Sequence, residues 1–166
     1  MISILSIGSN KMFKPQEIEY LSRINRFIRT EVTEIKEDKS ERVEEVIRKE
    51  GVALLARIKE KKFFALDPKG ASLTTESFAQ LIRGRNDLIS NHSQTDLGWK
   101  ASSGAKQNEM IFVIGGANGL SEEVKRRAEK TISLSAMIFT HEIARILILE
   151  QIYRTLTIEK GMKYHK

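Results

Sequence analysis

The stretch that decides the fold, residues 110–119, is MIFVIGGANG. Its first half, Met110–Ile114, is an unbroken apolar run of the length expected for a strand that is buried on both faces. The glycines after it allow a sharp turn and a close approach of the backbone to a ligand. The cluster matches neither G-x-G-x-x-G nor a P-loop. Taken alone, it fits a strand-ending turn as well as a ligand-binding loop.

Outward from this strand, the pattern of apolar residues predicts further strands at Ile2–Ile7, Val32–Ile35, Lys62–Leu66 and Ile132–Met137. The turn sequence DPKG at 67–70 is expected to end the strand before it. Helices are predicted at Pro15–Arg29, Ser40–Lys59, after the capping residues Thr74 and Ser121, and at Thr140–Ile158. This alternation predicts an α/β fold, with a mostly parallel sheet and helices on both of its faces. The absence of repeats and boundaries predicts one domain over residues 1–166.

The chain has 166 residues, a net charge of +6 and no cysteine. The lack of cysteine excludes disulfides, thiolate nucleophiles and Cys-based zinc sites, and we predict no metal site. Apolar runs of about 20 residues, which a membrane helix needs, are absent, and the N-terminus has no basic leader. We therefore expect a cytoplasmic protein that does not bind membranes. The basic charge favours a polyanionic partner such as a nucleic acid, although a lysine-rich surface is an equally ordinary explanation.

Residues 84–108 are polar and lack periodicity, which predicts a mobile insertion that is longer than compact domains usually contain. Trp99 and Lys100 within it are candidates for stacking on RNA and for charge contacts with it. A disordered insertion with no such role is the more common situation. A second loop, Ser133–Phe139, offers backbone groups and an apolar wall that would suit an adenine. Ordinary core packing is the more frequent role of its Met and Phe.

The last predicted helix is apolar on almost every side, which indicates that another subunit covers part of it. At about 100° per residue, His141 and Arg145 share one side, and Glu150 and Arg154 lie on the opposite side. One helix cannot easily direct both pairs at one point, so we hypothesise a homodimer whose sites are shared between subunits. The alternative is two ordinary i,i+4 pairs of modest stabilising effect.

Taken together and in order, several motifs of this chain resemble the RlmH (YbeA-like) family of SPOUT methyltransferases. The resemblance is dense from Phe112 onward and looser in the N-terminal half. The motifs are Phe112–Leu120 (FVIGGANGL), Ser133–Ser135, His141 with Arg145, Glu150–Arg154 (EQIYR) and Tyr164–Lys166, with Ile7–Gly8, Lys49–Gly51 and Leu66–Asp67 as the looser matches. The chain departs from the family at Thr140, where Pro is common, and at Ala117, where many members have Pro or Ser.

This resemblance implies a SPOUT fold with a C-terminal trefoil knot, which is a rare exception to the rule against knots. It also implies a homodimer that uses S-adenosylmethionine to methylate N3 of a pseudouridine in large-subunit rRNA on the assembled ribosome. The implied cofactor-binding residues are Leu66, Gly116, Ser135, Ala136, Met137, Ile138, Phe139 and Thr140. The implied catalytic and RNA-side residues are His141, Glu150, Arg154, Tyr164 and His165.

Methylation at N3 requires that a proton leave the ring, so a base or an electrostatic stabiliser is expected. Glu150 or His165 is the candidate proton acceptor, and Arg154 and Tyr164 would position the nucleotide. His141 would orient the base or a phosphate. Two other functions stay open at this point. One is a SPOUT methyltransferase for another rRNA base or a tRNA base, and the other is a dimeric ribosome- or RNA-binding protein without catalysis.

Overall fold

A computed structural model describes residues 1–84 and 109–164 of the chain. Of the insertion predicted at 84–108, only Gly84 belongs to these residues. Trp99, Lys100 and the candidate catalytic residue His165 lie outside them. The strands are β1 Ile2–Ile7, β2 Thr30–Ile35, β3 Phe64–Ser72, β4 Met110–Ile114 and β5 Lys130–Ser133. The helices are α1 Lys14–Ile24, α2 Val43–Ile58, α3 Thr75–Arg83, α4 Glu122–Arg127 and α5 His141–Glu159.

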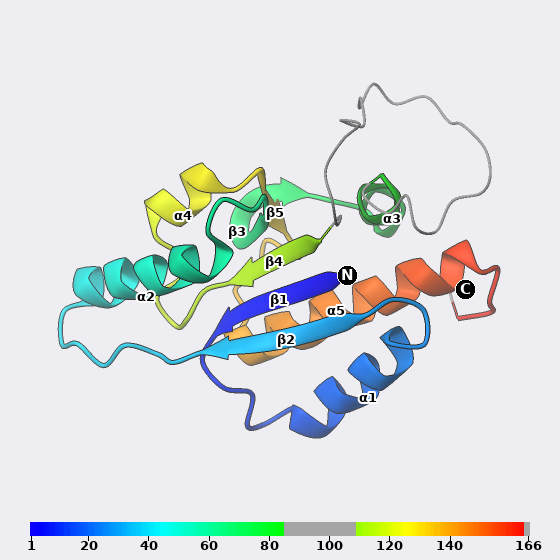
Figure 1. Ribbon diagram of the computed structural model, residues 1–166, viewed down its shortest axis with the longest axis horizontal. Helices are drawn as coiled ribbons and strands as arrows, with labels where there is room; N and C mark the ends of the chain where they lie inside the picture. The colour runs from blue at the N-terminus through cyan, green and yellow to red at the C-terminus, as the bar shows by residue number, and fades with distance from the viewer. Residues whose placement is uncertain (85–108, 165–166) are drawn as a thin grey trace.

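The strands form one sheet in the order β2-β1-β4-β3-β5, and every pairing is parallel (Figure 1). The strand predicted at Met110–Ile114 is β4, next to β1 near the middle of this order, and all of its residues are buried. Buried strands of a parallel sheet read as continuous apolar runs because helices cover both faces. The predicted α/β class and largely parallel sheet are therefore confirmed.

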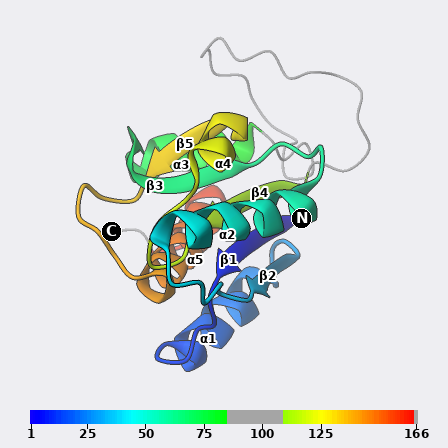
Figure 2. The same cartoon turned by 90° about the vertical axis from the view of Figure 1, so that its left-hand side faces the viewer.

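The helices divide between the two faces of the sheet (Figures 1 and 2). On one face, α1, α3 and α5 pack over a cluster that includes Ile4, Phe112 and Ile148. On the other face, α2 and α4 pack over a cluster that includes Ile7 and Val113. The core is thus built from both faces of the same strands, and α5 lies between α1 and α3.

Two helices begin at the capping residues that the sequence predicts. The hydroxyl of Thr74 accepts a hydrogen bond from the Ser77 amide at 3.1 Å, and that of Ser121 accepts one from Val124 at 3.2 Å. Thr140 caps α5 in the same way, which gives one physical use for a threonine at this position. These caps satisfy amide groups that would otherwise lack a partner in the first helical turn.

Two helix boundaries were predicted wrongly. Helix α1 ends at Ile24 and not at Arg29, because the side chain of Asn25 donates to the carbonyls of Leu21 and Thr30 and accepts from the Thr30 amide. These bonds turn the chain directly into β2. Helix α2 begins three residues after the predicted Ser40, whose amide donates to the Asp38 carboxylate instead.

The turn predicted at 67–70 does not end β3. The strand bulges there and pairs again with β5, so that Ile132 is the partner of both Leu66 and Ala71. Gly70 permits this crossing, because a Cβ at that position would stand 2.7 Å from the Ile132 carbonyl carbon. Strand β5 itself stops at Ser133 and not at Met137, since the Ser133 hydroxyl donates to the Ser135 carbonyl and closes a turn.

The sheet has a topological switch point between β1 and β4. The chain leaves β1 for α1 and β2 on one side, and leaves β4 for α4 and β5 on the other side. Helices α1 and α4 also cover opposite faces. In open parallel sheets, ligands bind in the crevice at the carboxyl ends of such strands. The switch point lies next to Gly8 and Gly115, which directly follow β1 and β4.

Candidate active site at the carboxyl edge of the sheet

Three separate segments of the predicted cofactor pocket belong to or follow three neighbouring strands, and Leu66 is paired with Ile114, the last residue of β4. Leu66 belongs to β3, Gly116 follows β4, and the loop 135–140 follows β5. Because β4, β3 and β5 are adjacent and parallel, their carboxyl ends lie along one edge of the sheet. The structure therefore brings together, at that edge, elements that lie far apart in the sequence. Their role in binding a cofactor stays a prediction.

The glycine cluster forms a tight turn. Gly116 and Gly119 are paired, and the Gly119 amide donates to the Gly116 carbonyl at 3.0 Å. Gly119 has a φ of +80°, a conformation that glycine adopts without strain. A Cβ on Gly116 would lie 2.9 Å from both the Glu50 carboxyl and the Ile7 side chain. This position therefore has no room for a larger residue unless its neighbours move.

The loop after β5 exposes apolar side chains. Met137 is 70% exposed and Ile138 is 86% exposed, while Phe139 is partly buried. The interpretation of this methionine as ordinary core is therefore wrong. The loop is held in shape by polar bonds, because the Ser135 hydroxyl accepts from the Met137 amide at 3.0 Å. A rigid loop with an apolar exposed tip suits contact with a ligand or with another protein chain.

His141 begins α5 and faces the end of β1. Its Nε2 lies 3.4 Å from the Ser9 carbonyl oxygen and 3.9 Å from a Glu37 carboxyl oxygen. A Cβ on Gly8 would stand 2.6 Å from the same nitrogen, so glycine is required for this close packing. The side chain of His141 is 16% exposed. His141 thus lies at the β1–β4 switch point, at the same edge of the sheet as the glycine turn.

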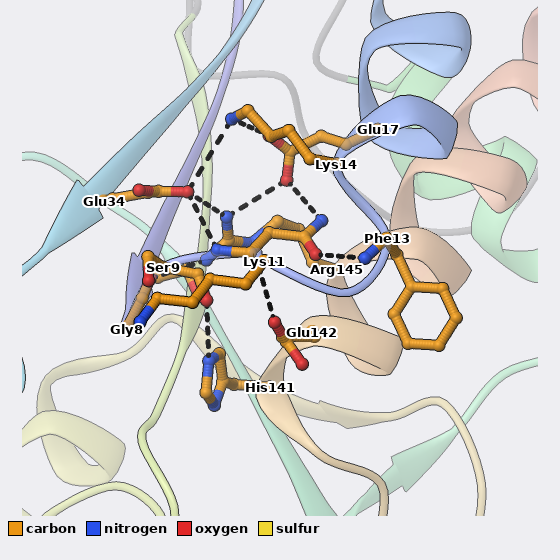
Figure 3. A network of polar contacts seen from close by, with 12 residues as sticks. Gly8, Ser9, Lys11, Phe13, Lys14, Glu17, Glu34, His141, Glu142 and Arg145 are labelled. Atoms are coloured by element: carbon orange, nitrogen blue, oxygen red, sulfur yellow. Dashed lines mark hydrogen bonds and ion pairs between the residues drawn. The ribbon is translucent and has the colours of Figure 1, made fainter.

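Arg145, one turn further along α5, is completely buried in a polar network (Figure 3). Its guanidinium donates to Glu17 at 3.0 Å, to Glu34 at 2.7 Å and to the Gly8 carbonyl at 2.8 Å. The prediction that His141 and Arg145 share a side is confirmed, because both contact residues 8–9. The network links α5 to α1, β1 and β2. Arg145 therefore has a structural role.

Sequence reasoning missed the partners of Arg145. Burial by itself raises the pKa of Glu17, but hydrogen bonds from Lys14, Asn10 and Arg145 outweigh it, so the pKa lies below its ordinary value. Glu34 behaves in the same way. Burial raises its pKa, but the hydrogen bonds from the Asn10 amide and from Arg145 outweigh burial, so the pKa of Glu34 is also lowered. An acidic residue in an amphipathic helix is usually solvated, and nothing local in the sequence marks Glu17 as buried.

A second cluster lies further along α5 and includes the chain after it. Arg154 Nε donates to Glu150 at 2.9 Å, and the Tyr164 hydroxyl lies 3.4 Å from the same carboxyl oxygen. The Arg154 guanidinium stands 5.0 Å from the centre of the Tyr164 ring. Burial and a hydrogen bond with Tyr20 raise the pKa of Tyr164 to about 12. The predicted pairing of Glu150 with Arg154 is confirmed, and Tyr164 joins them.

The two clusters are separated along the helix. Glu150 follows His141 by nine positions, which corresponds to about 14 Å along the axis. Within the described residues, one chain thus assembles Glu150, Arg154 and Tyr164 but does not bring His141 to them. The exposed surface of α5 is limited, since each of its residues is buried or partly buried. Helices α1 and α3 supply much of that cover.

Within residues 1–84 and 109–164, no helix combines the length and the hydrophobicity needed to cross a membrane. In the same residues, His, Asp and Glu side chains form no group of three or more that would hold a metal ion.

Comparison with known proteins identifies the class. A family model described as predicted SPOUT methyltransferase matches residues 1–165, so the chain belongs to this family and is a methyltransferase. A solved structure of a probable methylase family protein from Haemophilus influenzae superposes with a TM-score of 0.53 at 10% identity, covering 99% of this chain and 70% of the other. That similarity supports the fold alone.

Curated relatives narrow the class to one particular enzyme. The chain is 40% identical to the Ribosomal RNA large subunit methyltransferase H of Caldicellulosiruptor saccharolyticus, over 100% of both chains. It is 37% identical to the protein of that name from Clostridium botulinum over 99% of both chains. The one from Trichlorobacter lovleyi is 38% identical, over 89% of this chain and 86% of the other. The family resemblance proposed from the sequence is thereby confirmed.

Proposed function

We propose that this protein transfers a methyl group from S-adenosylmethionine to N3 of a pseudouridine in large-subunit rRNA, on the assembled ribosome in the cytoplasm. Full-length similarity to enzymes named Ribosomal RNA large subunit methyltransferase H supports rRNA as the substrate. The net charge of +6 suits a polyanionic partner, because lysine and arginine release counterions when they neutralise phosphates. The observation that carries the proposal is the alignment of Leu66, Gly116 and the loop 135–140 along one sheet edge.

The residues at that edge fit the donor. Gly116 presents its backbone where any side chain would collide with Ile7 and Glu50. The exposed Met137 and Ile138 supply an apolar surface for an adenine ring. Ser135 and Thr140 fix the two ends of that loop, through a turn and through the cap of α5. When bound, the donor supplies the methyl carbon as a sulfonium.

The cluster around Glu150 suits the acceptor base. Transfer would break the carbon–sulfur bond of the donor, leave the electron pair on sulfur, and form a carbon–nitrogen bond at N3. The N3 proton must leave, and Glu150 is our candidate for accepting it. Arg154 would stabilise negative charge on the ring carbonyls, and the protonated Tyr164 would donate a hydrogen bond to the nucleotide. His165 stays an alternative proton acceptor, outside the described residues.

A homodimer would complete this site. His141 and the donor edge lie at one end of α5, and Glu150, Arg154 and Tyr164 lie about 14 Å along it. In a symmetric dimer, the donor edge of one subunit can face the C-terminal cluster of its partner. The half-buried apolar residues of α5 and the exposed Met137 and Ile138 provide surface for such contact. We also propose that the C-terminal part of the chain forms a trefoil knot.

The direct test is to map methylation on large-subunit rRNA from cells with and without this chain. The proposal expects one pseudouridine to lose its N3 methyl group when the chain is absent, and to regain it on assembled ribosomes incubated with protein and donor. Methylation that disappears from tRNA or from a different rRNA base would reassign the target. If calorimetry detects no S-adenosylmethionine binding at millimolar donor, the protein is an RNA-binding module without catalysis.

A further inference from the structure

Glu50 is a buried carboxyl group that none of the roles above uses. It lies in the middle of α2, and the residue is only 5% exposed. Oε1 accepts a hydrogen bond from the Asp38 amide at 3.1 Å. Oε2 is buried and has no hydrogen-bond partner among residues 1–84 and 109–164. A buried carboxyl oxygen without a partner is costly, so its retention calls for a physical explanation.

The free oxygen of Glu50 points at the glycine turn. A Cβ on Gly116 would lie 2.9 Å from Oε2 and 3.3 Å from Oε1. The neighbouring Gly51 lets α2 come this close. A Cβ at Gly51 would stand 2.5 Å from the hydroxyl oxygen of Ser121, the capping residue of α4. Helix α2 therefore approaches the turn closely. The motif Lys49–Gly51 places a carboxyl group directly against the backbone of Gly116.

The charged side chains that influence Glu50 are mostly acidic. Burial is the largest influence and raises its pKa, and the carboxylates of Glu37 and Asp38 raise it further. His141 acts in the opposite direction. Lys49, the residue before Glu50 on α2, forms ion pairs with Glu45 at 2.8 Å and with Asp38 at 3.8 Å. The edge of the sheet at this point thus holds excess acidic character, which favours a cationic ligand.

The proposed donor is cationic at sulfur, and the product is a neutral thioether that is otherwise the same molecule. We propose that Glu50 is a positioning and specificity residue of the donor site, whose carboxyl favours the sulfonium donor over the thioether product. Methyl transfer removes the positive charge from sulfur, so the attraction that holds the donor is lost at the moment the product forms. Release of product then follows from the chemistry itself. This inference rests on the proposed function, because it assumes that Gly116 lines the donor pocket.

The test is calorimetry of S-adenosylmethionine and of S-adenosylhomocysteine with the full chain, its Glu50→Gln variant and a Glu44→Gln control. Glu44 lies on the same helix and is exposed. We expect Glu50→Gln to weaken donor binding by about 5- to 10-fold and product binding by less than about 2-fold, the scale of one partly screened charge interaction. Glu50→Asp, which keeps the charge, should retain most of the preference, and the control should match the original chain.

An equal loss of affinity for both molecules would show that Glu50 merely supports the turn, and unchanged affinities would remove it from the site. Either result overturns the inference but leaves the proposed function intact. If the original chain binds neither molecule, the proposed function itself fails. Should Glu50→Gln not fold, the donor affinity divided by the product affinity is measured in the original chain from acid to neutral pH. The preference for donor over product must rise with pH as Glu50 ionises. The same rise must occur in the His141→Gln variant, which excludes titration of His141 as its cause. A preference that does not change with pH contradicts the inference.

Discussion

The guanidinium of Arg145 and the carboxylate of Glu17 form an ion pair of 3.0 Å, with side chains that are 0% and 2% exposed. The two residues are 128 positions apart, one on α5 and the other on α1. Glu34 and the Gly8 carbonyl complete the shell around Arg145 (Figure 3). Because α5 also carries His141 and Glu150, this buried contact sets the position of the candidate catalytic residues relative to the sheet.

Replacing Arg145 should therefore destabilise the fold strongly. Arg145→Met leaves Glu17 without its buried cation, and removing one partner of a buried pair costs about 3–5 kcal/mol. Urea unfolding followed by circular dichroism measures the loss. The control is Arg23→Met, which removes an arginine whose pair with Glu19 is exposed and should leave the unfolding midpoint nearly unchanged. Equal effects of the two substitutions would contradict the structural role of Arg145.

The same network makes stability depend on pH. The pKa of Glu17 and that of Glu34 are lowered in the folded protein. Their contribution to stability is therefore present above the ordinary glutamate pKa and is lost as the pH falls through the lowered values. Glu17→Gln should flatten the decline of unfolding free energy on the acid side, whereas Glu41→Gln, at an exposed position, should keep the original slope. An unchanged slope in Glu17→Gln would count against this assignment.

The turn at Gly116 should not tolerate a side chain. In Gly116→Ala, the new methyl group would collide with Ile7 and Glu50 and shift the turn, so we expect donor affinity to fall by about tenfold or more while the protein stays folded. Calorimetry with S-adenosylmethionine measures the change. Gly84→Ala is the matched control, since a Cβ there meets its nearest atom at 3.4 Å. Full donor affinity in Gly116→Ala would place the donor elsewhere.

Tyr164 should act as a hydrogen-bond donor and not as a base. Its pKa is raised to about 12, so its hydroxyl keeps its proton throughout the range in which the enzyme can be assayed. We expect Tyr164→Phe to slow single-turnover methylation by about 5- to 10-fold, the effect of losing one hydrogen bond, with the same pH profile between about pH 6 and 10. A limb of the profile that disappears in Tyr164→Phe would argue that this tyrosine titrates during the reaction.

Subunits that share sites should rescue each other. If His141 of one subunit works with Arg154 of its partner, a mixed dimer of His141→Ala and Arg154→Ala chains contains one intact site. Co-expression of the two inactive variants should then restore about a quarter of the original activity, because half of the dimers are mixed and each has one working site of two. Either variant alone should stay inactive. No recovery, or a monomer by light scattering at micromolar concentration, would refute the shared site.

Much of the fold follows from local sequence. Met110–Ile114 is buried on both faces, and its apolar run is recognisable because parallel strands covered by helices carry no polar alternation. Thr74 and Ser121 mark helix starts because their hydroxyls satisfy amides within the next three residues. The candidate cofactor-binding and catalytic residues were inferred from the order of several motifs, which carries family information that no single motif contains.

What the sequence alone determined was the α/β class, the principal buried strands, the two capped helix starts and the family, since each depends on residues that are close together in the chain or on an ordered series of motifs. Only the tertiary structure decided that β3 continues past Asp67, that Glu17 and Glu34 surround Arg145, and that Glu50 lies against Gly116. These contacts join residues separated by tens of positions, and strand order and helix packing select them. Local propensity carries no information about such partners, because the cost of burying a charge or bending a strand is offset by groups that folding alone brings near.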